Sequence, residues 1–191
     1  MRRMRVVVVA AGVVIALAVG TAGCGGEPAA GAMPAGHASA SVRQAEVYVQ
    51  VLRRYLGTPA ENSFPGHAFT TVYVLDRAYR DAAVPGGTHD RGTPITAQAR
   101  RQVTAALAGM AHVVFITSRD SVLETRDGCG HVKNGGILIT LGPLGGGGHR
   151  VRVAVNGFVA CLGATGLTYV LQNQPGRGWR VTGTTGPMAI S

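Results

Sequence analysis

The chain has 191 residues and a formal net charge of +9, from 18 Lys and Arg against 9 Asp and Glu. Hydrophobic residues make up 46% of it, enough to bury a core, and charged residues only 14%, which excludes a charged disordered tail. Three cysteines exclude a dense disulfide scaffold. Lys133 is the only lysine, and no stretch interleaves basic with aromatic residues, so the charge does not indicate a nucleic-acid partner.

The first 23 residues have the pattern of an export signal. Arg2, Arg3 and Arg5 precede an apolar run over residues 6–19, which is shorter than the about 20 residues that a membrane span needs. Small residues then lead to a cysteine, in the order Thr21-Ala22-Gly23-Cys24. This stretch resembles the lipobox of bacterial lipoproteins. An ordinary secreted protein that is cleaved nearby is the alternative.

The lipobox resemblance implies an anchored, exported protein. Residues 1–23 would be its signal peptide, and Cys24 would carry the lipid that holds it on the extracytoplasmic face of the cell membrane. Residues 24–40 are rich in Ala, Gly, Pro and Ser without a hydrophobic period, which predicts a flexible tether. Residues 41–191 are then predicted to form a single domain.

Hydrophobic spacing predicts two amphipathic helices in that domain. The first begins at Ser41, whose hydroxyl would form a capping box with Gln44, and ends at Gly57. The second begins near residues 93–96 and ends at Gly109, after an apolar stripe of helical period.

Segments rich in β-branched residues or alternating in polarity predict strands at 70–76, 112–117, 137–141, 151–155, 167–172 and 179–182. Together these elements predict an α+β fold, with two amphipathic helices packed on one face of an antiparallel sheet that ends in a meander. The segment from Leu167 to Thr182 is similar to the last hairpin of NTF2-like and cystatin-like domains. That similarity implies a long helix across a curved sheet, with Trp179 beneath it. As a whole, the chain resembles uncharacterised small lipoproteins of high-GC bacteria.

The two remaining cysteines are predicted to form a disulfide. With Cys24 assigned to lipid, Cys129 and Cys161 are an even pair in an exported domain. A reactive thiol is the alternative, but it needs a basic environment that the sequence does not reveal.

Candidate catalytic and cofactor motifs are weak. The glycine-rich segment 142–150 lacks the Gly-Lys-Ser/Thr of a phosphate-binding loop, so it predicts a hairpin loop. His89, Asp90 and His131 have metal-competent side chains but no zinc spacing, and we expect neither metal nor cofactor. A Ser-His-Asp set can be written from the following residues, although nothing in the sequence positions it: Ser118 or Ser121, His89 and Asp120.

The distribution of acidic residues is more informative, because no Asp or Glu follows Asp127. Arg150 and Arg152 lie two apart on a predicted strand and therefore share a face. If Arg180 pairs near them, this face could bind an anion such as a phosphate or an acidic polymer. The alternative, and the more common arrangement, is a solvated face whose arginine stems cover apolar neighbours.

These patterns favour a lipid-anchored envelope protein that binds a protein or a small anionic ligand and has no enzymatic activity. Its predicted partners are the membrane, through Cys24, and that ligand. The alternative function is a cell-surface hydrolase that uses the His and Asp residues.

Overall fold

The computed structural model describes residues 35–64, 66, 68–87 and 91–191, with the backbone alone for 35–38. Its helices are α1 (Ala35–Gly57), α2 (Pro59–Asn62) and α3 (Ala97–Leu107), with 3-10 turns η1 (Arg119–Val122) and η2 (Lys133–Gly135). The first strands are β1 (Thr71–Ala78), β2 (Thr93–Pro94), β3 (His112–Ile116), β4 (Leu123–Arg126) and β5 (Cys129–Val132). The others are β6 (Ile137–Leu141), β7 (Gly145–Gly147), β8 (Arg150–Ala160), β9 (Gly163–Gln174) and β10 (Gly178–Ile190).

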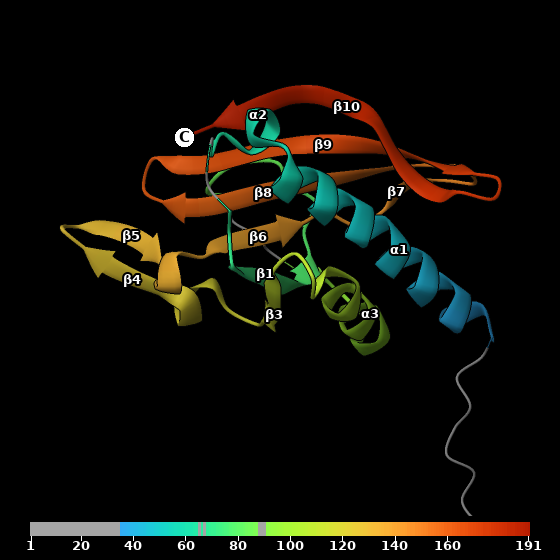
Figure 1. The fold of residues 1–191 in the computed structure, drawn as a ribbon, viewed down its shortest axis with the longest axis horizontal. Coiled ribbons are helices and arrows are strands. Elements are labelled where there is room, and N and C mark those ends of the chain that lie inside the picture. The colour runs from blue at the N-terminus through green and yellow to red at the C-terminus, as the bar shows by residue number, and fades with distance from the viewer. Residues whose placement is uncertain (1–34, 65, 67, 88–90) are drawn as a thin grey trace, which may run out of the picture. The chain divides into compact units, whose positions relative to one another are not determined.

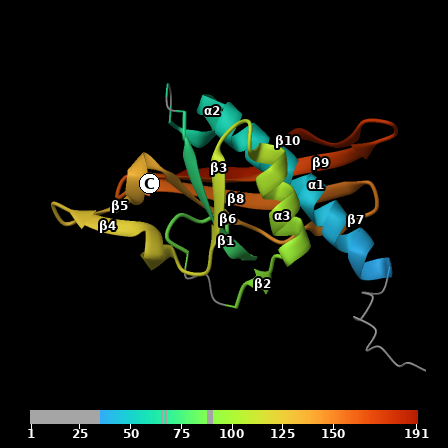
Figure 2. The ribbon, with the colours of Figure 1, turned by 60° about the horizontal axis from the view of Figure 1, so that its bottom comes forward.

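The two long helices cover one face of the sheet, as the sequence predicts. Figures 1 and 2 show α1 running across the strands with α3 beside it. Each helix turns its apolar stripe inward, so that Leu52 of α1 and Val103 of α3 are fully buried in the core. Thr96 caps α3 by accepting a hydrogen bond from the backbone N–H of Ala99 at 3.1 Å. No described helix is both long and apolar enough to cross a membrane.

The start of α1 differs from the prediction. The helix begins at Ala35, and Ser41 lies within it, only 3% exposed, so the capping box at Ser41 is wrong. Alanine has the highest helix propensity, and the alanines before Ser41 carry the helix back into the last residues of the predicted tether. The signal peptide, Cys24 and the rest of the tether lie outside the described residues.

The sheet is mixed, so the prediction of an antiparallel sheet is wrong. Its main strand order is β10-β9-β8-β6-β1-β2, and β1 runs parallel to both β6 and β3. The chain passes from β1 through α3 to β3, and a strand–helix–strand connection of this kind places its two strands in parallel. The strands β6, β8, β9 and β10 are antiparallel neighbours and confirm the predicted meander in this part of the sheet.

The two faces of the sheet are covered to different extents. The helix-covered face carries the main core, which includes Val153, Tyr169 and Trp179. On the opposite face, a smaller apolar cluster with Tyr73, Leu138 and Val132 covers the region around β1 and β6. That cluster does not reach the first half of β8, where Arg150 and Arg152 are exposed beside β9 and β10. The outer face of β8, β9 and β10 is therefore open to solvent at that end.

The predicted disulfide is present. Cys129 opens β5, Cys161 lies in the turn between β8 and β9, and their Cα atoms are 5.5 Å apart. The bond joins the β4–β5 hairpin, which extends to one side in Figure 1, to the β8–β9 turn of the meander.

Candidate functional site

The three predicted anion-binding arginines lie on the open outer face of the sheet. In the register, Arg150 of β8 pairs with Gln172 of β9, and Gln172 pairs with Arg180 of β10. Directly paired residues project from the same face, so Arg150, Gln172 and Arg180 form a row across three strands. Arg152 shares this face, two residues along β8. We call these four exposed residues the arginine face.

The spacing of the row suits one anion. Neighbouring strands are about 4.8 Å apart, so the backbones of Arg150 and Arg180 are about 10 Å apart, with Gln172 between them. Two arginine side chains that lean toward Gln172 can bring their guanidinium groups to the same ligand. The planar guanidinium donates paired N–H groups that match the oxygens of a phosphate or carboxylate, and the Gln172 amide adds a further donor.

A shallow hollow of about 400 Å³ adjoins the row. Its lining includes Arg150, Arg152, Val170, Thr185 and the backbone of Gly145 and Gly146. The glycines of β7 pair with β8 beside the two arginines, and having no side chains they leave the guanidinium groups uncovered. This segment was predicted as a hairpin loop, and the short strand β7 within it is an addition to that prediction.

The charge of the arginine face is not neutralised by described residues. None of its three arginines forms an ion pair among them. The cause lies in the sequence, since β7, β8, β9 and β10 all belong to the segment after Asp127 that has no Asp or Glu. The face therefore carries a positive potential that an anionic ligand would neutralise.

A second cleft lies around Trp179, between α1, α3 and the β9–β10 hairpin. It consists of two hollows of about 560 and 370 Å³ that share Val42, Glu46 and Trp179. The Arg43 guanidinium lies over the Trp179 ring, 5.2 Å from its centroid. The lining mixes Glu46 with arginines, so it favours no single ligand chemistry. Ser39 and His149 also line the larger hollow.

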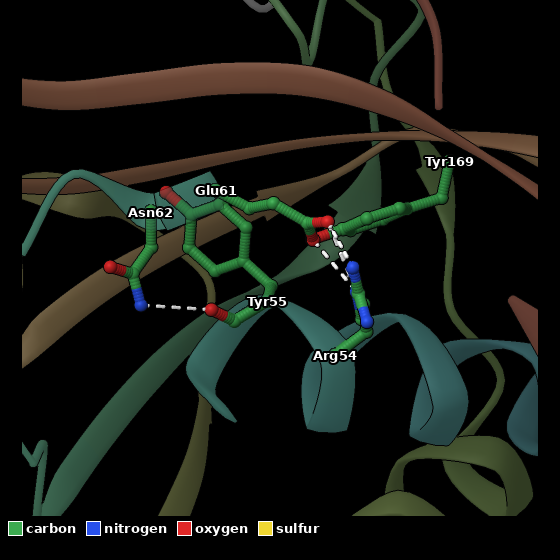
Figure 3. Close-up of polar contacts among 5 residues, drawn as sticks. All are labelled: Arg54, Tyr55, Glu61, Asn62 and Tyr169. Atoms are coloured by element: carbon green, nitrogen blue, oxygen red, sulfur yellow. Dashed lines mark hydrogen bonds and ion pairs between the residues drawn. The ribbon is translucent and has the colours of Figure 1, made fainter. Parts of the chain in front are cut away.

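Glu61 of α2, shown in Figure 3, is a carboxylate with two side-chain partners. It accepts hydrogen bonds from the Arg54 guanidinium and, at 2.6 Å, from the Tyr169 hydroxyl. Burial alone would raise the pKa of Glu61, but these hydrogen bonds outweigh it, and the pKa is lowered. Burial and the Glu61 carboxylate raise the pKa of Tyr169. At neutral pH Glu61 is therefore ionised and Tyr169 neutral, an arrangement that holds α2 on the sheet and does not make Glu61 a carboxylic acid of raised pKa.

The residues of the predicted hydrolase are not brought together where the structure describes them. Ser118 accepts a hydrogen bond from the backbone N–H of Asp120, and Ser121 donates to the Ser118 carbonyl, so both hydroxyls serve the turn η1. His131 lies opposite Glu124 in the β4–β5 hairpin. His89 and Asp90 lie outside the described residues. Within the described part of the chain, no three His, Cys, Asp or Glu side chains are grouped so that they could hold a metal ion.

Comparisons with known proteins find no matching family model, curated protein or solved structure. Any function proposed for the chain therefore rests on its own sequence and geometry. Sequence reasoning selected the three arginines but missed Gln172, whose place between Arg150 and Arg180 depends on the pairing of three strands.

Proposed function

We propose that this protein is a lipid-anchored, extracytoplasmic envelope protein that binds an anionic ligand on the arginine face and acts as a binding module. The observation that carries the proposal is the row formed by Arg150, Gln172 and Arg180, with Arg152 beside it. Such a face combines bidentate donors, open access and an unneutralised charge, three properties that suit a ligand bearing phosphate or carboxylate groups.

The register supports anion binding over a merely solvated face. Arginines whose stems only cover apolar neighbours can lie anywhere along exposed strands. Here Arg150 and Arg180 lie in register on both sides of an amide. Arg150 and Arg152 pair with the glycines of β7, which leave them accessible. Like charges placed this close repel one another, and a bound anion relieves that repulsion.

We expect pyrophosphate to bind the protein through the arginine face. The double variant R150Q/R180Q should weaken this binding about 30-fold at low ionic strength, equivalent to about 2 kcal/mol for two exposed charge-assisted contacts. Binding by the unaltered chain should also weaken as salt is added, because these contacts are exposed. Isothermal titration calorimetry at two salt concentrations measures both effects.

The matched control for this titration is R80Q/R126Q. It removes the same number of positive charges, from the exposed turn after β1 and from β4, whereas the arginine face is on β8, β9 and β10. The control should bind pyrophosphate as the unaltered chain does. Equal weakening in both double variants would indicate attraction by net charge alone and would contradict a specific site.

The proposed anchor has a separate test on the cellular protein. Small residues before Cys24 and the apolar run before them support acylation of that cysteine, and two or more acyl chains would hold the protein stably at the membrane. Mass spectrometry of the mature protein should find an acylated Cys24 as its first residue. An unmodified N-terminus at another residue would contradict the anchor and leave the arginine face unaffected.

A further inference from the structure

The strand β3 forms an unprotected edge of the sheet. Among the described strands it pairs with β1 alone, and the backbone N–H of His112 donates to the Thr70 carbonyl at 2.8 Å. Backbone N–H and C=O groups alternate in direction along a strand. Those of His112, Val114 and Ile116 therefore point toward β1. The N–H and C=O groups of Val113 and Phe115 therefore point away from the sheet, toward the space beyond its edge.

The opposite edge, β10, is built differently. Its pairing with β9 shifts register twice, between Val181 and Gly183 and between Thr185 and Ala189. Gly186 has a positive φ of 74°, and Pro187 lacks a backbone donor. Bulges and proline are features with which proteins prevent further strands from adding to an edge. The edge β3, with the sequence His-Val-Val-Phe-Ile, has neither proline nor glycine, and its register with β1 is regular.

A groove of about 490 Å³ runs along β3, with α3 as its other wall. Figure 2 shows the helix beside this strand. The wall of α3 contributes Ala97, Arg100, Arg101 and Thr104, and the strand contributes residues 112–115. This lining contains two arginines and a histidine but no carboxylate. Arg100 reaches Asp76 at 3.5 Å, whereas Arg101 is exposed and makes no ion pair with a described residue.

We propose that this groove binds an extended acidic segment of a partner protein as an additional strand beside β3. The backbone of the segment would pair with Val113 and Phe115. Alternate side chains of an added strand point toward the helix-covered face, where acidic groups would meet Arg100 and Arg101. The intervening side chains would lie on the outer face, next to the half-buried Val114 and Ile116, where β-branched residues fit. Strand addition thus supplies affinity through the backbone and selectivity through charge.

The test uses the full chain labelled with ¹⁵N and, as probe, the acetylated and amidated peptide Glu-Val-Glu-Val-Glu-Val. We expect the peptide to slow hydrogen exchange at the Val113 and Phe115 amides. A peptide N-methylated at alternate residues should lose this effect, because it cannot pair, and a peptide with Lys in place of Glu should bind more weakly.

The variant R101E should weaken binding of the peptide about fivefold, as expected for one exposed ion pair that becomes a repulsion. The control R126E, on β4, should bind as the unaltered chain does.

Three outcomes would overturn the proposal. The first is unchanged exchange at Val113 and Phe115 at saturating peptide. The second is equal binding of the N-methylated peptide, which would show that the backbone does not pair. The third is protection of these amides that rises with protein concentration and without peptide, which would assign the edge to a second copy of the chain. None of these outcomes depends on the arginine face, so this proposal and the proposed function stand or fall separately.

Discussion

Replacing Gly166 with alanine should lower the free energy of unfolding by about 3 kcal/mol, the upper part of the range for overpacking a buried site. Gly166 lies in β9, and a Cβ atom there would be 1.9 Å from the Ala83 carbonyl oxygen and 2.6 Å from its carbon. These are backbone atoms, so no side-chain rotation relieves the overlap. Either the segment that contains Ala83 or the strand must move.

The segment around Ala83 has little freedom to move. Ala82 is fully buried, the N–H of Tyr79 donates to the Leu141 carbonyl at 2.8 Å, and that of Val84 donates to Asp81 at 2.8 Å. Displacing the segment would break such contacts, which is why we expect a large effect. Thermal and urea unfolding of G166A measure it.

Gly183 of β10 provides the control for this substitution. A Cβ atom there would meet nothing within 4 Å, and its φ is not in the positive region, so G183A should change the stability by less than about 0.5 kcal/mol. Equal stability of G166A and the unaltered protein would contradict the close approach of Ala83 to β9.

Local sequence patterns predicted the main helices and strands of this fold. They could not predict contacts between segments that are distant in the sequence. The apolar stripe of α3 and its start near residues 93–96 follow from residues within one helix, and both are confirmed. The requirement for glycine at position 166 arises from a backbone segment 83 residues away, which no local pattern reveals. The mixed sheet is an intermediate case: the order of strand, helix and strand over residues 71–116 is itself a signal of parallel pairing that our prediction did not use.

Some signals in the sequence were available and missed. Asp127 and Gly128 have φ angles of 51° and 76°, as the tight turn of the β4–β5 hairpin requires, and Asp-Gly is a strong marker of such turns. The strand β10 continues to Ile190, past the predicted end at Thr182, because bulges accommodate Gly183, Gly186 and Pro187. At the candidate site, alternation placed Arg150 and Arg152 on one face, whereas the position of Arg180 required the register of three strands.

Removing the Cys129–Cys161 disulfide should lower the free energy of unfolding by about 3.5 kcal/mol, from the chain entropy that a loop of this length gains when it opens. The two cysteines are 32 residues apart in sequence, so the bond restricts a long part of the unfolded chain. That part contains β6, β7 and β8, which carry Arg150 and Arg152 of the arginine face. The bond therefore constrains the segment from which part of the proposed site is built.

In the folded state, few other contacts hold the β4–β5 hairpin to the rest of the sheet. The hairpin pairs with the rest of the sheet only through His131 and Ala160, among the described strands. Val132 at its base is buried in the smaller apolar cluster, so hairpin and cluster should loosen together when the bond is absent. The effect should thus appear both in the global transition and as faster hydrogen exchange in β4 and β5.

The double variant C129S/C161S, compared with the unaltered protein in thermal and urea unfolding, measures this contribution. Reductant should destabilise the unaltered protein by a similar amount and leave the double variant unchanged, which separates loss of the bond from the effect of serine.

Alkylation of the denatured, non-reduced domain should label neither Cys129 nor Cys161. Two labelled thiols would contradict the disulfide itself. Faster exchange in the hairpin with an unchanged global transition would instead show that the bond secures only the hairpin, and that the sheet bearing the arginines is held by its own core.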